Sequence, residues 1–415
     1  MDKKIVVLVE PSFYGVNYVR EAKKLDCFVV VVVSDKNNPQ VYGYNDLYDD
    51  MLVCDIRDPE SIYHAIKGSK YKHIDALISA TDYAIANTSK AAEKLGLKYL
   101  SYGAAQCVRN KDIARQCYAD NHVPSARFSV VRTMEQAEEA ALKIGFPVVL
   151  KPTNCASSQH VFFIDNVKDL YDAFKEMKSF MTTYMGFQVR EDYLVEEYLD
   201  GPEFSVEIFV EDGQVIFSEL TEKITTALPF FVENYHIFPS SIMQLEKPSI
   251  IDVAAQALNA IGLVNGPAHV EVKYTTQGPK IVEVNGRPGG DNITSDLIPT
   301  AYHIDIFRQT VRNLLGLPVD FNLDNTSSSA IGFICANKEG ILESIVDLDK
   351  LEEDESVVRY SIDAKVGDKV RVPESSDDRL GYVIVNIPTP EQAKNKIINI
   401  INSIKVNIKS KQLVM

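Results

Sequence analysis

The chain has 415 residues, which is more than one ordinary hydrophobic core holds, so its length predicts about two to four domains. A hydrophobic fraction of 46% and a charged fraction of 24% are typical of a globular protein. The net charge of −15 argues against non-specific binding to nucleic acid or to anionic membranes, although basic residues grouped locally could still bind an anionic ligand.

Cysteines and apolar runs exclude further classes of protein. The six cysteines are scattered without a CxxC pair, so we expect neither a zinc site nor a disulfide framework. The apolar run at residues 5–9 is short and meets Glu10, which does not resemble a signal peptide. The longest apolar run, residues 27–33, is far below the length that spans a membrane. We therefore expect a cytoplasmic protein.

The first 105 residues alternate between strand and helix patterns. Short apolar runs at 5–9, 28–33, 51–54 and 76–79 are separated by amphipathic stretches that we expect to be helical. Strands that are apolar on both faces are typical of a parallel sheet covered by helices. The pattern predicts a doubly wound parallel α/β domain over residues 1–105.

This predicted domain lacks the fingerprint of a dinucleotide site, because no G-x-G-x-x-G follows its first strand. Asp82 follows the strand expected at 76–79, near the edge where such sheets bind ligands. It would either contact a substrate or, as the simpler alternative, cap the next helix.

Further along, helix and strand patterns continue to about residue 315. A helix opens at Lys111, and a strand at 146–152 ends in Lys151-Pro152. Residues 194–199 and 203–210 have strand patterns, and 250–261 has the pattern of an amphipathic helix. The segment 221–239 has no clear periodicity and is expected to be a long loop, although its apolar content argues against disorder.

Residues 266–291 predict a β-hairpin, because two alternating runs at 269–273 and 281–285 flank a turn. If the hairpin is centred on Gln277, Glu271 lies opposite Glu283 and His269 lies opposite Asn285. The expected apolar face then consists of Val270, Val272, Val282 and Val284.

Facing carboxylates repel each other, so a cation is expected between them. Carboxylate and amide oxygens suit Mg²⁺ or Mn²⁺, and Arg287 beside them suits phosphate chemistry. The alternative is an exposed hairpin with solvated carboxylates.

The predicted helices and strands and their charged residues, in this order along the chain, resemble the ATP-grasp superfamily of carboxylate–amine ligases over residues 105–315. The resemblance implies that Lys111 and Lys151 bind ATP phosphates and that Glu203 binds ribose. It implies adenine contacts, largely through backbone groups, from Glu196, Glu197, Tyr198 and Leu199. It also implies that Glu271, Glu283 and Asn285 hold the metal, and that Arg287 stabilises the phosphate in transit, with Lys223 as a further positive charge.

Within the superfamily, the pair Glu233-x-x-His236 followed by Arg287 resembles L-amino acid α-ligases, which make dipeptides. This resemblance implies that Glu233 and His236 shape the amino-acid pockets, although they could instead hold the loop in place. The resemblance also assigns Gly289, Gly290 and Asp291, which follow shortly after Arg287, to substrate binding.

Three features depart from the family pattern. The phosphate-covering loop at 154–160 contains no glycine, so its backbone is less free to wrap phosphates. Ser157 and Ser158 in this loop can still donate hydrogen bonds. Asp291 stands where dipeptide ligases can carry a bulky side chain, and the chain contains no tryptophan.

Together these patterns predict a multidomain protein of α/β and α+β architecture. We expect an N-terminal α/β domain (1–105), an ATP-grasp lid subdomain (106–190), an ATP-grasp catalytic subdomain (191–325) and a small C-terminal α+β cap (326–415). The expected function is an ATP- and Mg²⁺-dependent ligase that joins a small carboxylate to an amino-acid amine through an acyl phosphate. The alternatives are an ATP-grasp carboxylase or purine-pathway ligase, or a non-catalytic nucleotide-binding protein. We expect the partners to be small-molecule substrates, and neither nucleic acid nor a membrane. For the oligomeric state, the expectation includes a homodimer.

Overall fold

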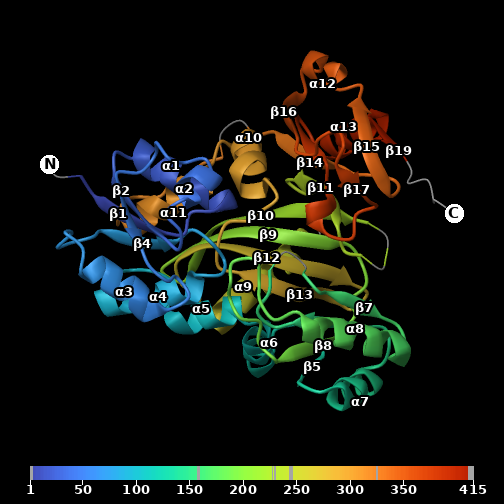
Figure 1. Ribbon diagram of the computed structural model, residues 1–415, viewed down its shortest axis with the longest axis horizontal. Helices are drawn as coiled ribbons and strands as arrows, with labels where there is room; N and C mark the ends of the chain where they lie inside the picture. The colour runs from blue at the N-terminus through green and yellow to red at the C-terminus, as the bar shows by residue number, and fades with distance from the viewer. Residues whose placement is uncertain are drawn as a thin grey trace.

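An eight-stranded antiparallel sheet forms the centre of the molecule, as a computed structural model shows (Figure 1). The structure describes residues 3–156, 159–226, 228, 230–242, 246–323 and 326–409. In sheet order, the central strands are β13 (Gly278–Asn285), β12 (Gly266–Thr275), β9 (Glu203–Glu211), β10 (Gln214–Thr225), β11 (Glu233–Phe238), β14 (Ser328–Ile334), β18 (Gly381–Ile387) and β16 (Val357–Ile362). Helices α5 (Tyr102–Arg109), α6 (Lys111–Asp120) and α9 (Lys247–Ile261) help to form the apolar core at the β13 end of this sheet.

The N-terminal residues form the predicted parallel α/β sheet. Its strand order is β3 (Asp50–Val53), β2 (Phe28–Val33), β1 (Ile5–Val9) and β4 (Ala76–Ser79). Helices α3 (Pro59–Lys67) and α4 (Ile85–Leu95) cover one face, and α1 (Val16–Lys24) covers the other. The short helices η1 (Phe13–Gly15) and α2 (Asn38–Val41) follow β1 and β2. Strands β1, β2 and β4 are buried on both faces, which explains their continuous apolar runs, whereas β3 at the edge is partly exposed.

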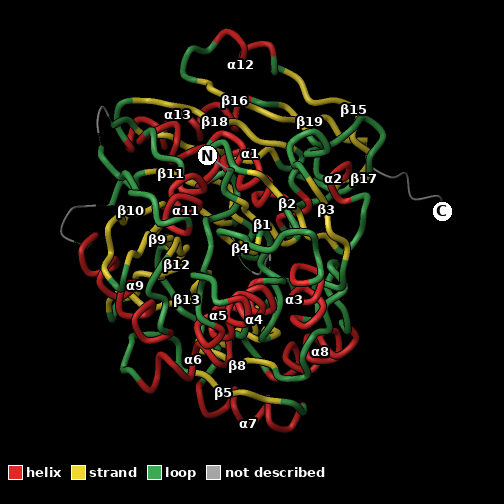
Figure 2. The backbone as a smooth tube through the Cα atoms, turned by 90° about the vertical axis from the view of Figure 1, so that its left-hand side faces the viewer, coloured by secondary structure: helices red, strands yellow, loops and turns green. Residues whose placement is uncertain are grey.

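One helix that covers this N-terminal sheet comes from a distant part of the sequence. In Figure 1 the orange α11 (Ile306–Leu314) lies among the blue N-terminal elements, and Figure 2 places it beside α1 and β1. Its Phe307 and Val311 are fully buried in the same apolar cluster as Tyr18 of α1. The N-terminal core is therefore completed by residues that follow the central hairpin.

A separate four-stranded sheet forms the lid at the lower right of Figure 1. Its order is β5 (Phe128–Val131), β8 (Tyr193–Glu197), β6 (Val148–Pro152) and β7 (Phe162–Ile164), and α7 (Met134–Ile144) and α8 (Val167–Ser179) pack on it. Because β8 belongs to this sheet, the lid sheet extends beyond residue 190.

The C-terminal residues form an α+β part whose strands extend the central sheet, because β14 pairs with β11 and with β18. Helix α13 (Pro390–Ser403) contributes to the apolar core there. The remaining elements are the small sheet β17 (Lys369–Val370), β15 (Gly340–Val346) and β19 (Lys405–Lys409), with η2 (Ile293–Leu297), α10 (Ile298–Tyr302), α12 (Asp349–Glu353) and η3 (Ser376–Asp378). Across the ranges that the structure covers, none of the helices is both long and apolar enough to cross a bilayer.

The prediction of one long loop over 221–239 is wrong at both ends of that segment, where strands replace the loop. β10 extends to Thr225, and β11 begins at Glu233 and pairs with it. Lys223 and His236 are buried like the apolar residues beside them. Because buried positions in these strands hold polar residues, the apolar–polar alternation by which strands are recognised is absent from the sequence.

The predicted hairpin is confirmed, including the pairing of Glu271 with Glu283 and of His269 with Asn285. One detail differs, because a bulge makes Val272 pair with Ile281 instead of Val282. Ile281 is fully buried in the core, whereas Val282 lines a cavity on the opposite face. The prediction that Val282 belongs to the apolar face is therefore wrong.

Candidate active site

Most of the predicted site residues lie around one cavity of about 970 Å³, which the N-terminal part, the lid, the central sheet and the C-terminal part all line. The predicted residues that line it are Asp82, Lys111, Lys151, Glu196, Glu197, Tyr198, Leu199, Glu203, Lys223, Glu233, His236, Glu271, Glu283, Asn285, Arg287, Gly290 and Asp291. Gly289 is not among the lining residues. Ser157 and Ser158 lie outside the described residues.

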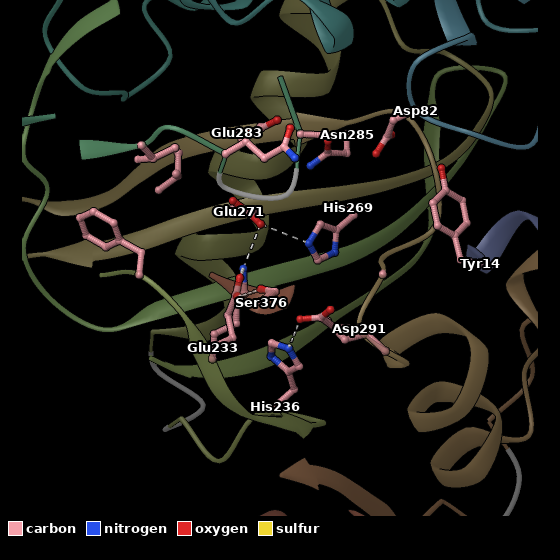
Figure 3. Close-up of a pocket in the computed structure, with 18 of the residues that line it drawn as sticks. Tyr14, Asp82, Glu233, His236, His269, Glu271, Glu283, Asn285, Asp291 and Ser376 are labelled. Carbon is pink, nitrogen blue, oxygen red and sulfur yellow. Dashed lines mark hydrogen bonds and ion pairs between the residues drawn. The ribbon is translucent and has the colours of Figure 1, made fainter. Parts of the chain in front are cut away.

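The two facing carboxylates of the hairpin point into this cavity, with Asn285 beside them (Figure 3). Lys223 Nζ donates to Glu271 Oε1 at 2.9 Å, and Lys111 Nζ lies 3.0 Å from Glu283 Oε1. Both glutamate side chains are about one-fifth exposed. The alternative of an exposed hairpin with solvated carboxylates is therefore wrong.

Lys223 is the centre of a cluster of carboxylates. Its ammonium lies 2.9 Å from Glu271, 3.0 Å from Glu203 and 3.4 Å from Glu233. Burial by itself would lower the pKa of Lys223, but these carboxylates, Glu271 foremost, raise that pKa well above its usual value. Lys223 therefore stays charged and links the hairpin to β9 and β11.

His269 supports the same cluster from the side of the hairpin. Its Nδ1 lies 2.8 Å from Glu207 Oε1, and its Nε2 lies 3.6 Å from Glu271. Burial opposes the charged imidazolium, yet Glu207 and Glu271 raise the pKa of His269 to about 9. A Cβ on Gly289 would come within 2.7 Å of the His269 ring, so this glycine allows the loop to pass close to the histidine.

The donor set of the hairpin fits a hard divalent cation, because it combines two carboxylates with one amide. Among the described residues, no three His, Cys, Asp or Glu side chains are grouped tightly enough to hold a metal ion by themselves. The candidate set of Glu271, Glu283 and Asn285 includes an amide, and each of its carboxylates contacts a lysine. A bound cation would compete with these two lysines for the carboxylate oxygens.

Lys151 and Glu196 form a buried ion pair at the base of the lid, with Nζ and Oε2 2.6 Å apart. Arg115 Nε also donates to Glu196, at 2.5 Å. Burial alone would raise the pKa of Glu196, but Arg115 and Lys151 lower it to about 2. The side chain of Glu196 is thus used within the protein, and its backbone lies inside the lid sheet, where it pairs with Phe128 and Val149.

Arg115 is not among the site residues predicted from the sequence. Its guanidinium also donates to the carbonyls of Ile281 and Val282, at 3.0 and 2.8 Å. It therefore joins α6, the lid strand β8 and the bulge of β13. The only sequence signal is its position four residues after Lys111 on one helix, which places both side chains on the same face.

One aromatic and one basic side chain, Tyr198 and Lys273, line the cavity at the predicted adenine contact. The ring of Phe163 packs edge-on against Tyr198, with centroids 5.0 Å apart. Lys273 Nζ lies 5.5 Å from the centre of the Tyr198 ring and 3.8 Å from Glu203. Flat apolar surface beside polar groups is an arrangement that can hold a base and a ribose.

Arg287 connects the hairpin to the N-terminal part of the chain. Its Nε donates to Asp82 Oδ1 at 2.5 Å, and its guanidinium lies 5.0 Å from the centre of the Tyr14 ring. Burial and Asp82 act oppositely on the pKa of Arg287, and Asp82 prevails and raises it. The alternative that Asp82 caps a helix is wrong, because Ala84 is the N-cap of α4.

Glu233 joins the Lys223 cluster to a second charged network in the cavity. His236 Nε2 lies 3.2 Å from Asp291 Oδ2, as Figure 3 shows. Arg379 donates to Asp291 and to Glu233, at 3.0 Å each, and lies 3.7 Å above the Phe333 ring. Burial would raise the pKa of Asp291, but His236 and Arg379 lower it. Arg379 belongs to the C-terminal part, and no sequence motif pointed to it.

Comparisons with known proteins agree with this arrangement. Residues 144–296 match the family described as ATP-grasp domain, and residues 332–409 match the family described as L-amino acid ligase C-terminal domain 2. An L-amino acid ligase from Bacillus licheniformis has a similar fold, with a TM-score of 0.82 at 19% identity, covering 99% of this chain and 100% of that one.

Among curated proteins, the chain is 23% identical to the uncharacterized protein y4rH of Sinorhizobium fredii, over 98% of this chain and 84% of that protein. It is 27% identical to alanine–anticapsin ligase of Bacillus subtilis, over 59% of this chain and 58% of the ligase. It is 22% identical to the L-arginine-specific L-amino acid ligase of Bacillus subtilis, over 73% of this chain and 72% of that protein. The chain thus spans less than two thirds of alanine–anticapsin ligase. With both domain families matched in order, the chain carries an ATP-grasp domain followed by an L-amino acid ligase C-terminal domain.

Proposed function

We propose that the chain uses ATP to join the carboxylate of an amino acid or small acyl acid to the amine of an amino acid, releasing ADP and phosphate. The observation that carries this proposal is the position of Arg287 at the end of a hairpin whose Glu271 and Glu283 face each other in one cavity. Anion-binding arginine, hard-cation ligands and lysines in one place are the requirements of phosphoryl transfer.

In the proposed first step, an oxygen of the substrate carboxylate attacks the γ-phosphorus of ATP, and the bond to the β-phosphate oxygen breaks. The products are an acyl phosphate and ADP. Lys111 and Lys151 neutralise phosphate charge, and Arg287 holds the phosphoryl group as it moves. Glu271, Glu283 and Asn285 would hold Mg²⁺, which supplies charge stabilisation to the phosphate oxygens when bound.

In the proposed second step, the amine of an amino acid attacks the acyl carbon, and phosphate leaves. The amine loses a proton, and the product is an amide. Glu233 and His236 line the same cavity, and we assign one of them to orient the amine. Asp291, held by Arg379 and His236, supplies a fixed negative charge to the wall of a substrate pocket.

A turnover assay tests the reaction class. ADP release is measured with ATP and Mg²⁺ plus pairs of amino acids, and the products are identified by mass spectrometry. We expect stimulation by amino-acid pairs and a product mass that equals the sum of the two minus water. Stimulation by bicarbonate or formate alone would instead indicate a carboxylase or purine-pathway ligase. Tight ATP binding without any ADP production would indicate a non-catalytic nucleotide-binding protein.

Substitution of Glu283 tests the metal assignment. Glu283→Gln removes one anionic cation ligand while it keeps the size of the side chain, so we expect ligase turnover to fall by about 100-fold or more. The matched control is Glu139→Gln on the exposed face of lid helix α7, which should keep wild-type turnover. Ordinary turnover by Glu283→Gln at limiting Mg²⁺ would show that the metal assignment is wrong.

A further inference from the structure

Beyond Arg287, the cavity continues toward the N-terminal sheet into a region that the proposed phosphate chemistry does not use. We call this region the N-terminal lobe. Its lining residues are Ser12, Phe13, Tyr14, Asn17, Asp82 and Tyr184. Figure 3 shows Tyr14 and Asp82 on one side of the cavity, away from Asp291 and His236. The lobe is therefore distinct from the charged network around Arg379.

Two aromatic side chains at this lobe are exposed to an unusual degree. Phe13 is 63% exposed and Tyr184 is 54% exposed. Their ring centroids are 6.2 Å apart, and the ring planes are nearly perpendicular, at 87°. Phe13 comes from η1, directly after β1, and Tyr184 comes from the lid segment between α8 and β8. Exposed rings that converge on a cavity from two parts of a chain are typical of a ligand-binding surface.

Both rings are supported from behind, so their positions are defined before any ligand arrives. Tyr42 packs edge-on against Phe13 with centroids 5.2 Å apart, and Tyr83 packs edge-on against Tyr184 at 5.3 Å. The lid segment is fixed further by Thr81, whose hydroxyl donates to Met185 Sδ at 3.3 Å. Such pre-organisation reduces the entropy that binding costs.

The backbone of Phe13 gives a second, independent observation. Its φ is +47°, in the left-handed region that a bulky residue other than glycine rarely adopts. Strain of this kind persists where the surrounding structure enforces it, and it is concentrated at functional sites. Phe13 also lies at the carboxyl end of β1, the edge where open α/β sheets bind ligands.

The inner end of the lobe is charged, because Asp82 and Arg287 form their ion pair there. A free amino acid has a charged backbone end and a side chain, which match this charged inner end and the aromatic outer end. We infer that the N-terminal lobe binds an amino-acid substrate with a large apolar or aromatic side chain, and that Phe13 and Tyr184 contact that side chain as specificity-determining residues. This inference rests on the proposed function.

The test compares wild type with Phe13→Ala and Tyr184→Ala, and the matched control is Tyr171→Ala. Tyr171 is an aromatic residue on lid helix α8 with a similar exposure of 49%, and it does not line the cavity. Two quantities are measured for phenylalanine, leucine and glycine: the dissociation constant by calorimetry in the presence of ATP and Mg²⁺, and kcat/KM from ADP release. Melting temperature and ATP affinity are measured for every variant.

We expect wild type to prefer phenylalanine and leucine over glycine by tenfold or more. Phe13→Ala and Tyr184→Ala should lose at least tenfold in affinity and in kcat/KM for the large amino acids, with less than a twofold change for glycine. Tyr171→Ala should behave like wild type. Equal losses for all three amino acids, or no preference in wild type, would overturn the inference.

The two measurements separate this inference from the proposed function. Binding of phenylalanine that depends on Phe13, without any ligase turnover, would support the lobe assignment and refute the proposed reaction. Turnover with amino-acid pairs that is indifferent to both aromatic substitutions would support the reaction and refute the lobe assignment. If Phe13→Ala unfolds, Phe13→Gly replaces it, because glycine tolerates the left-handed backbone.

Discussion

At the scale of single residues, the site keeps charged side chains buried by pairing them across separate elements. Glu196 is the best example, because its carboxylate in β8 contacts both Arg115 of α6 and Lys151 of β6. The sequence predicted Lys151 and Glu196 at the cavity, but it did not predict that they contact each other. Removing one member of such a group leaves an uncompensated buried charge, which costs about 3–5 kcal/mol.

The pH dependence of stability tests this pairing. The pKa of Glu196 is lowered to about 2 in the folded chain, from 4.5, so its contribution is present above pH 4.5 and is lost as pH falls through 2. At pH 6, Glu196→Gln should lower the free energy of unfolding by about 3 kcal/mol. Urea unfolding at several pH values should show the gap to wild type narrowing between pH 4.5 and 2.

An exposed glutamate provides the control for this experiment. Glu139→Gln should unfold like wild type at each pH, because Glu139 lies on the exposed face of α7. A gap between Glu196→Gln and wild type that stays constant from pH 6 to pH 2 would contradict the pairing, since a protonated glutamate resembles glutamine.

At the scale of elements, the bulge in β13 decides which side chains reach the cavity. Ile281 and Val282 are consecutive apolar residues, so alternation alone cannot tell which of them faces the core. The structure places Ile281 in the core and Val282 at the cavity, and Arg115 donates to both of their carbonyls. Local sequence does not determine which of these two residues faces the core. In the folded chain, the contact with α6 occurs together with Ile281 in the core and Val282 at the cavity.

Two alanine substitutions test the bulge. Ile281→Ala removes a fully buried side chain, so we expect it to lower the free energy of unfolding by about 2–4 kcal/mol. Val282→Ala, at the partly exposed cavity wall, should cost less than about 1 kcal/mol and should mainly change the KM for ATP. Chemical denaturation and steady-state kinetics measure the two effects. The reverse order of stabilities would show that the regular, unbulged register is the correct one.

At the scale of the whole molecule, chain order and spatial order differ. Helix α11 follows the central hairpin in sequence, yet Phe307 packs edge-on against Tyr18 with ring centroids 5.0 Å apart. Arg308 of the same helix donates to Glu21 of α1 at 2.8 Å. The N-terminal sheet therefore has one face that the first 105 residues alone do not fully cover.

A fragment of residues 1–105 tests this dependence. Without α11, the fragment should expose the apolar face of α1 and lack fixed tertiary packing. We expect near-normal far-ultraviolet circular dichroism, weak near-ultraviolet signals and strong binding of the dye ANS. The control is the full chain, which should not bind the dye. A fragment with sharp near-ultraviolet signals and cooperative melting would show that residues 1–105 fold independently.

The sequence by itself determined the elements whose pattern is local: the N-terminal parallel strands, the hairpin with Glu271 opposite Glu283, and the order of charged residues that resembles the ATP-grasp ligases. Only the tertiary structure decided which of those charges meet, because Arg115 and Arg379 reach the cavity from elements without a recognisable motif. It also decided that residues 233–238 form a strand, since the buried His236 is polar and the apolar–polar alternation that identifies a strand is absent. Local periodicity is set by neighbours in the chain, whereas the identity of a charged partner is set by packing between distant segments.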